Sequence, residues 1–284
     1  MRRESTVADH RERVLRAVVE IERDLDRDAS LEELAEQACL SPFHFHRVFA
    51  GLMGEGPAEY TRRLRLERAA QGLAATGDRI VDIGKRAGYA KPESFTRAFR
   101  ARFGTTPSKF RAEHAPRWAE REPIGEKATG RIEIVPELPV AFIRHVGAYE
   151  NVAPQFDRLR QWGEARAGRV PKGRDPLLMG IAHDIPGVTP VEQLRFDCCM
   201  EVQLGCRPEG EVGVRTAFGG AYAVGLHQGT FATLAQTYSR LAREFVPSQK
   251  AVLAGGPAIE IYLTPPERTM SEPGLTEILM EVRV

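Results

Sequence analysis

Residues 31–49 read LEELAEQACLSPFHFHRVF, and residues 80–99 read IVDIGKRAGYAKPESFTRAF. In the first stretch a helical pattern ends at a sharp turn around Cys39, and a second helix begins at Ser41 and Pro42. Serine caps the first free N–H groups of a helix, and proline suits the first helical position, so this dipeptide is a strong start signal. The pattern therefore predicts two short helices that cross steeply at a turn, with small residues where they approach.

The second stretch is a copy of the first. At an offset of 49, Leu34, Ala35, Ala38, Cys39 and Leu40 correspond to Ile83, Gly84, Ala87, Gly88 and Tyr89. At an offset of 50, Arg47, Phe49, Gly54, Pro57 and Tyr60 correspond to Arg97, Phe99, Gly104, Pro107 and Phe110. Residues 60–75 contain no helix breaker except Gly72, so we expect one helix that fixes the spacing of the two units. A supporting helix precedes them, with an apolar stripe at Val14, Val18, Ile21 and Leu25.

The charge is distributed unevenly along the 284 residues. Residues 51–121 carry 15 basic and 8 acidic side chains, whereas residues 1–50 carry 8 and 11 and residues 122–284 carry 17 and 20. An excess of positive charge around the paired units favours a polyanionic partner. The four cysteines show no zinc-site spacing, and no apolar run has the length of a membrane helix, so we expect a cytoplasmic protein without a metal site or other cofactor.

The C-terminal half contains a second internal repeat. VAFIRHVGAYENVAPQFDRL, from Val140, aligns with YAVGLHQGTFATLAQTYSRL, from Tyr222, and pairs His145 with His227 at an offset of 82. Later the offset is 80, where MEV at 200–202 pairs with MEV at 280–282. Each copy reads strand, helix, strand, strand. We therefore expect an all-α domain over residues 1–114, a linker over 115–130 that lacks periodicity, and an α+β domain of two repeats over 131–284.

The sequences SPFHFHRVFAGLMGEGPAEY and GYAKPESFTRAFRARFGTTPSKFR resemble the DNA-binding domain of the AraC/XylS family of transcriptional regulators, over about residues 10–114. The motifs HVGAYENV, HQGTF and AIEIYLTPPE look like the GyrI-like small-molecule-binding domain. The resemblance implies a regulator whose partners are double-stranded DNA, a small-molecule effector and RNA polymerase. It also implies that the second helix of each unit enters the major groove.

Helical periodicity agrees with this implication. In the first reading helix Phe45, Val48, Phe49 and Leu52 form the core face, and in the second Phe95, Ala98 and Phe99 do so. Side chains on the outward faces are then candidates for DNA contact: Phe43, His46, Arg47, Glu93, Thr96, Arg97 and Arg100. Arginine can bind guanine through two hydrogen bonds, whereas Glu93 can accept from cytosine or repel phosphate.

In the C-terminal half, Glu260 and Tyr262 share one face of an otherwise apolar strand. A carboxylate beside an aromatic ring suits an organic cation, and the resemblance supports this because GyrI-like domains carry a pocket glutamate at the matching position. Glu260 on a solvated sheet face is the simpler alternative. Further aromatic residues could either line a pocket or fill the core: Tyr149, Trp162, Phe218, Tyr222 and Phe231.

The predicted function is therefore a DNA-binding regulator that senses a small, apolar, cationic molecule and performs no chemistry of its own. The alternative is a C-terminal hydrolase of reactive small molecules, in which Glu260 and Tyr262 act as acid/base and orienting groups. The sequence shows no nucleophile elbow, phosphate loop or metal cluster beside them, which favours sensing.

Overall fold

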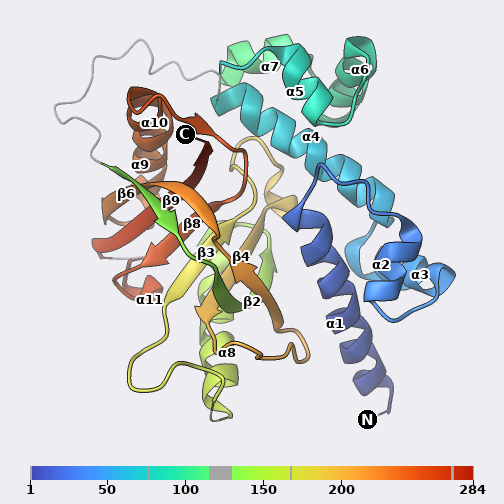
Figure 1. Cartoon of the computed structure of the whole chain (residues 1–284), viewed down its shortest axis with the longest axis vertical. Coiled ribbons are helices and arrows are strands. Elements are labelled where there is room, and N and C mark those ends of the chain that lie inside the picture. The colour runs from blue at the N-terminus through green and yellow to red at the C-terminus, as the bar shows by residue number, and fades with distance from the viewer. Residues whose placement is uncertain (1, 76, 115–129, 167, 270–271, 284) are drawn as a thin grey trace. The chain divides into compact units, whose positions relative to one another are not determined.

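The computed structural model describes residues 2–75, 77–114, 130–166, 168–269 and 272–283 (Figure 1). It divides into a helical unit, which holds helices α1–α7, and a sheet unit, which holds strands β1–β9 and the helices between them. The predicted linker, residues 115–130, lies outside the described residues except for Gly130. None of the described helices is both long enough and apolar enough to cross a membrane.

The helical unit contains the helices that the two copied stretches predict. Its elements are α1 (Arg2–Arg23), α2 (Leu31–Gln37), α3 (Pro42–Met53), α4 (Pro57–Ala75), α5 (Ile80–Arg86), α6 (Pro92–Phe103) and α7 (Pro107–His114). The pairs α2–α3 and α5–α6 form the two helix-turn-helix units, and the linking helix α4 starts at Pro57 rather than at Tyr60.

The turns of the two units have the same backbone geometry. Gly54 and Gly104 end α3 and α6 in the left-handed region, at φ 78° and 72°. Within the turns, Cys39 and Gly88 also have positive φ values, 52° and 86°. A left-handed residue lets the chain reverse at once after a short helix, and a non-glycine residue such as Cys39 adopts it at some cost.

The two units also repeat their aromatic cores. Phe45, Phe49 and Tyr60 are fully buried in the first unit, where Phe49 meets Tyr60 at a ring separation of 5.6 Å. Phe95, Phe99 and Phe110 repeat the arrangement in the second, where Phe99 meets Phe110 at 5.3 Å. The prediction that Leu52 belongs to the core face was wrong. Leu52 is 41% exposed, because Met53, the next residue on the i, i+4 row of Phe45 and Phe49, packs on the core instead.

A buried carboxylate on α4 ties the two helix-turn-helix units together. Glu67 is 1% exposed, and its oxygens accept from Arg63 Nη1 at 3.1 Å and from Arg102 Nη2, in the last turn of α6, at 2.8 Å. Arg63 also bonds Glu55, in the loop that follows α3, at 2.6 Å. A continuous chain of charges therefore runs from the end of the first reading helix to the end of the second.

The sheet unit is one antiparallel sheet with helices packed on it, which agrees with the expected α+β class. Its strands are β1 (Arg131–Val135), β2 (Leu138–Val146), β3 (Leu178–Ala182), β4 (Arg195–Glu201), β5 (Gly213–Ala217), β6 (Gly220–Gly229), β7 (Val252–Leu253), β8 (Ala258–Tyr262) and β9 (Gly274–Arg283). Its helices of more than one turn are α8 (Ala153–Glu164) and α9 (Leu234–Arg240), and α9 continues through a π-helical turn, Leu241–Phe245, into the short α10 (Val246–Ser248). The short α11 spans Pro266–Thr269.

The strands lie in the order β1-β6-β9-β8-β3-β4-β2-β5, with β7 paired to β9. The two middle strands are β8 and β3, and Glu260 lies directly opposite Gly180 in that pair. Gly180 in turn lies opposite Cys198 on β4, and Glu260 opposite Ile278 on β9. Residues opposite one another in an antiparallel sheet share a face, so these four residues form one row across the sheet.

Both longer helices cover the face that carries this row, which we call the helix face. Phe156 of α8 packs with Cys198 and Tyr262, and Leu234 and Leu241 pack with Ile278. Figure 1 shows α8 and α9 near opposite ends of the sheet. The middle strands β3 and β8 therefore lie between the areas that the two helices cover.

The charge chain through Glu67 leads to a prediction about stability. Glu67→Ala leaves Arg63 and Arg102 without their buried counter-ion, so we expect it to lower the unfolding free energy by about 2–4 kcal/mol. The loss stays in this range because both arginines are partly exposed to water. Urea denaturation followed by circular dichroism measures the change. Glu113→Ala is the control, because Glu113 pairs with Lys109 on the surface and should cost less than about 0.5 kcal/mol. Equal costs for the two variants would contradict the proposed role of Glu67.

Candidate functional site

The outer faces of α3 and α6 carry the residues predicted to contact DNA. Phe43 is 79% exposed in the first turn of α3, and His46 and Arg47 are exposed behind it. On α6, Glu93, Arg97 and Arg100 are exposed and Thr96 is half-buried. All seven side chains therefore lie at the surface of the helices on which the sequence placed them.

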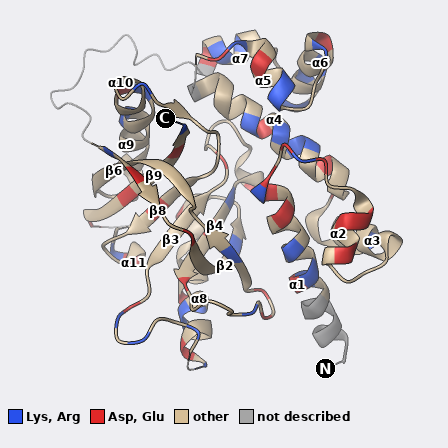
Figure 2. Ribbon diagram, viewed as in Figure 1, with Lys and Arg blue, Asp and Glu red and all other residues tan. Residues whose placement is uncertain are grey.

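The arginines on these faces differ in their surroundings. Arg47 Nη2 lies 3.4 Å from His44 Nδ1, so its guanidinium group lies beside the start of its own helix. Among the described residues, no hydrogen bond or ion pair engages the side chains of Arg97 and Arg100. Figure 2 shows basic residues along α4 and α6 of the helical unit. Exposed guanidinium groups without an acidic partner keep their donors available to an anionic ligand.

Glu260 is the most unusual group of the sheet unit. It is 9% exposed, and its two oxygens accept hydrogen bonds from two phenols: Tyr238 Oη on α9 at 2.8 Å and Tyr262 Oη on its own strand at 2.7 Å. Among the described residues, no arginine, lysine or histidine forms an ion pair with it. The simpler alternative from the sequence, which placed Glu260 on a solvated sheet face, is therefore wrong.

Aromatic rings surround this carboxylate. Tyr262 meets Phe156 and Phe231, each at a ring separation of 5.6 Å. Across the middle of the sheet Phe196 meets Tyr149 at 5.1 Å. Gly180 provides the space for these rings, since a Cβ atom there would lie 2.1 Å from Phe196 Cζ and 2.6 Å from the Tyr262 hydroxyl. The rings thus close over β3 only because residue 180 has no side chain.

Burial and hydrogen bonding act in opposite directions on Glu260. Burial raises the pKa of its carboxyl group above the ordinary value, and the hydrogen bonds from Tyr262 and Tyr238 lower it only in part. Burial likewise raises the pKa of both phenols, and the Glu260 charge adds to that effect. Glu260 is therefore a buried carboxyl group whose compensation, among the described residues, consists of two phenolic hydrogen bonds and no cationic side chain.

The other aromatic residues predicted for the pocket divide into two sets. Tyr149 belongs to the same cluster, although its hydroxyl donates to the backbone oxygens of Asp184 and Arg195, at 2.8 and 3.0 Å. Among the described residues, no hydrogen bond, ion pair or ring contact joins Trp162, Phe218 or Tyr222 to Glu260. Trp162 instead stacks on Arg169, and Phe218 meets Tyr222.

Sequence reasoning missed Tyr238 and Phe196 as members of this site. The repeat alignment already paired Tyr238 with Phe156, and a tyrosine that replaces a core phenylalanine brings a hydroxyl that needs a partner. Nothing comparable marked Phe196, because its role depends on the pairing of β3 with β4 and on Gly180, over which its ring lies.

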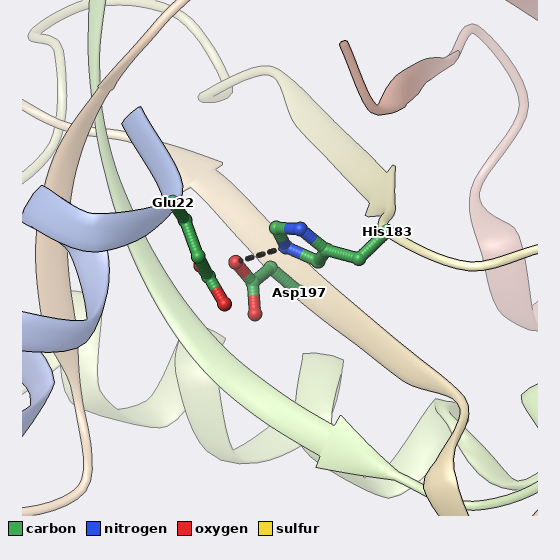
Figure 3. A group of neighbouring side chains, drawn as sticks. All are labelled: Glu22, His183 and Asp197. Atoms are coloured by element: carbon green, nitrogen blue, oxygen red, sulfur yellow. Dashed lines mark hydrogen bonds and ion pairs between the residues drawn. The ribbon is translucent and has the colours of Figure 1, made fainter. Parts of the chain in front are cut away.

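A second buried acid lies on the other face of the sheet. Figure 3 shows the ring of His183 bonded to Asp197, with Nε2 to Oδ2 at 2.9 Å. Arg144 and Arg215 bond the same carboxylate at 2.7 and 3.2 Å. Burial raises the pKa of Asp197, but these cationic neighbours hold it well below the usual range. Histidine and aspartate are metal-ligating residue types, yet a metal ion here would have to displace two guanidinium groups.

Two family models match the chain. The model described as GyrI-like small molecule binding domain matches residues 130–283, and the model described as helix-turn-helix domain matches residues 34–113. The first therefore covers the whole described sheet unit, and the second covers the helix-turn-helix units from residue 34, within α2, onward.

Relatives match the helical unit. HTH-type transcriptional regulator Rv1931c of Mycobacterium tuberculosis is 42% identical over 79 residues, which are 28% of this chain and 30% of that protein, so the chain spans less than a third of that relative's length. HTH-type transcriptional activator AarP of Providencia stuartii is 33% identical over 94 residues, 33% of this chain and 70% of that protein. A solved structure described as an EcmrR–DNA complex covers 90% of this chain and 99% of its own, with 14% identity and a TM-score of 0.48.

The raised pKa of Glu260 leads to a prediction about pH. A carboxyl group whose pKa is higher in the folded state stabilises the fold fully below its unfolded pKa of about 4.3, and this stabilisation is lost as the pH rises through the folded value. Compared with Glu260→Gln, the unliganded wild type should therefore lose unfolding free energy as the pH rises above about 4.3, by at most about 1.4 kcal/mol per pH unit. Urea denaturation of both proteins across this range measures the difference.

The control is Glu192→Gln, which alters an exposed residue and should follow the wild type at every pH. If the difference in unfolding free energy between wild type and Glu260→Gln stayed constant with pH, Glu260 would have the same pKa in the folded and unfolded states.

Proposed function

The chain belongs to the GyrI-like family of small-molecule-binding domains and carries an AraC-type helix-turn-helix region, and from this premise we propose that it regulates transcription in response to an organic cation. The observation that carries the effector part is the buried Glu260, compensated by two phenols and by no basic side chain among the described residues. The partners in this proposal are double-stranded DNA, the cation and RNA polymerase. The proposed domains are residues 1–114 and 131–284, joined by a linker at 115–130.

The DNA-reading part rests on the matched outer faces of α3 and α6. Arg47 and Arg97 occupy equivalent positions in the two copies, and both are exposed. A guanidinium group in the major groove recognises guanine through two parallel hydrogen bonds. The second helix of each unit then reads one groove segment, with Phe43 and His46 beside Arg47 on α3 and with Glu93, Thr96 and Arg100 beside Arg97 on α6.

The sheet unit, in the same proposal, consists of two repeats around a central site. The strand order supports this, because β8, β9, β6 and β1 lie on one side of its midpoint and β3, β4, β2 and β5 on the other. The histidines support it too. His145 Nε2 bonds the backbone oxygen of Ala148 at 2.9 Å, and His227 Nε2 bonds that of Thr230 at 3.1 Å, three residues along in each copy. Both contacts agree with a structural role at the strand end.

The cation would bind by taking the place of the phenolic hydrogen bonds around Glu260. Its charge neutralises the carboxylate in surroundings of low dielectric, where an ion pair is stronger than in water. The rings of Tyr262, Phe156 and Phe231 offer faces that attract a cation. Inorganic cations are disfavoured because they would lose their water shell in this apolar site.

Hydrolysis remains the alternative for the same residues. Both oxygens of Glu260 are engaged by phenols, and burial raises the pKa of Cys198, the neighbouring thiol, so that it stays protonated and weakly nucleophilic. The relatives that match the helical unit are named as transcriptional regulators. We therefore propose a sensor without catalysis.

Substitution of the two equivalent arginines tests the DNA-reading proposal. Arg47→Ala and Arg97→Ala should each weaken specific binding by ~1–3 kcal/mol and relax the preference at one base pair, because each removes a two-point contact with a base. Selection of a binding site from random DNA with the full chain, followed by gel-shift titration and footprinting, measures both effects. Arg23→Ala is the control, since Arg23 is exposed at the end of α1 and pairs with Glu20. Footprints that cover one groove segment only would exclude reading by two units.

Glu260→Gln tests the effector proposal, because it keeps the shape of the side chain and removes its charge. Apolar cations that raise the melting temperature of the wild type should bind the variant at least about tenfold more weakly, whereas neutral molecules of similar shape should change little. Because the empty site has a raised pKa, cation binding should release a proton, and affinity should fall as the pH decreases through that pKa.

Calorimetry in two buffers of different ionisation enthalpy measures the released proton, and product analysis of the same mixtures tests for turnover. Glu192→Gln again serves as the control. Normal binding by Glu260→Gln together with loss of a wild-type product would favour the hydrolase instead.

A further inference from the structure

The two halves of the helix face differ in chemistry. The two repeat copies can be compared position by position at an offset of 80. The first copy has an apolar residue or glycine at three positions where the second has a polar side chain: Gly180 against Glu260, Ala182 against Tyr262, and Phe196 against Thr276. On the covering helices, at an offset of 82, Phe156 corresponds to Tyr238. In each pair the polar side chain comes from the second copy. The site therefore has one polar half, on β8 and β9, and one apolar half, on β3 and β4.

Thr276 is the polar residue that the proposed function does not use. It is 0% exposed, and its Oγ1 atom has no hydrogen-bond partner among the described residues. On β9 it lies directly opposite Tyr262 of β8 and His227 of β6, so its side chain lies on the helix face, diagonally beside Glu260. A buried hydroxyl without a partner is costly, and such groups are uncommon in native proteins.

The side chains directly opposite Thr276 make hydrogen bonds to other groups. The Tyr262 hydroxyl donates to Glu260 at 2.7 Å. His227 bonds Thr237 Oγ1 through Nδ1 at 2.9 Å and the Thr230 backbone oxygen through Nε2 at 3.1 Å. A molecule that enters the site can therefore supply the partner that Thr276 Oγ1 lacks among the described residues.

The apolar half has room for the body of such a molecule once two rings move. Phe196 and Tyr262 occupy the space over Gly180, where a Cβ atom would lie 2.1 and 2.6 Å from them. Both rings end rotatable side chains, so other rotamers can vacate this space. Tyr238, which donates a hydrogen bond to Glu260 from α9, is only half-buried, so its displacement would be the route by which a ligand reaches the carboxylate.

We propose that the effector is a protonated amine with at least one N–H group on a flat apolar body, and that Thr276 selects it against quaternary ammonium ions. The amine donates to Glu260 and to Thr276 Oγ1, while its apolar body lies over Gly180 against Phe196 and Cys198. A quaternary ion can neutralise Glu260 but has no N–H group to donate to the threonine hydroxyl. A site that hydrogen-bonds its ligand therefore binds such an ion more weakly. This inference rests on the proposed cation site at Glu260 and adds the class of cation.

A matched pair of probes tests the selection: the 4-phenylbutylammonium ion and its trimethylammonium counterpart, titrated calorimetrically into the full chain. The wild type should bind the primary ammonium ion about tenfold or more tightly than the quaternary ion, as one hydrogen bond between charged and neutral groups implies. Thr276→Val keeps the branched shape and removes the hydroxyl, so it should lower this ratio about tenfold while leaving the affinity for the quaternary ion unchanged. Thr276→Ser, which restores a hydroxyl, should restore the preference.

The same variants distinguish a failure of the inference from a failure of the cation site. If Glu260→Gln weakens both probes but Thr276→Val keeps the wild-type ratio, the cation site stands and the selection by Thr276 is wrong. If neither probe binds the wild type, or if Glu260→Gln binds both normally, the cation site and the inference are both wrong. The melting temperature of unliganded Thr276→Val should be equal to or above that of the wild type, because no hydrogen bond is lost. A clear decrease would show that the hydroxyl is structural and would overturn the proposal.

Discussion

A carboxylate that leaves water has to be compensated, and this constraint organises both units of the protein. Glu67 is compensated by Arg63 and Arg102, and Asp197 by Arg144, Arg215 and His183. Glu260 alone of the three accepts only phenolic hydrogen bonds among the described residues. The first two acids are complete as they stand and hold elements together, whereas Glu260 lacks a full positive charge. All three acids are buried, so they differ in their partners rather than in the depth of burial.

The charge chain through Glu67 connects the two helix-turn-helix units. Each helix-turn-helix unit has its own aromatic core, so packing alone would leave the pair joined only by α4. Glu67 adds contacts to the loop after α3, through Arg63 and Glu55, and to the last turn of α6, through Arg102. These contacts act at the ends of the two reading helices. The angle between α3 and α6 therefore depends on these ion pairs as well as on the linking helix α4.

Local signals made the helical unit predictable, whereas pairing between distant segments limited the prediction of the site. Ser41, Pro42 and the turn glycines act within a few residues of their own position, and the structure confirms the helices that they predicted. Glu260 could be singled out because a charge interrupts an apolar strand. Thr276 gave no such signal, because a threonine is ordinary in a strand and becomes unusual only when its partners across β8 and β6 are known. Strands β1 and β5, at the two edges of the sheet, were not part of the predicted strand, helix, strand, strand pattern. Strand β1 pairs with β6, which is far away in the sequence, and no local pattern reveals such a pairing.

The proposed cation site has to remain stable without its ligand, and the two phenols provide this stability for Glu260. Burial favours the neutral carboxyl, and the hydroxyl groups of Tyr238 and Tyr262 can bond it in either protonation state, so the empty site tolerates its acid without a counter-ion. A full guanidinium partner, as at Asp197, would lower the pKa further but would also occupy the place of a cationic ligand. Phenols give weaker compensation and can be displaced. In the proposed cation site, phenols would therefore combine a stable empty state with a gain on binding, to which apolar surface on the cation would add by covering the rings.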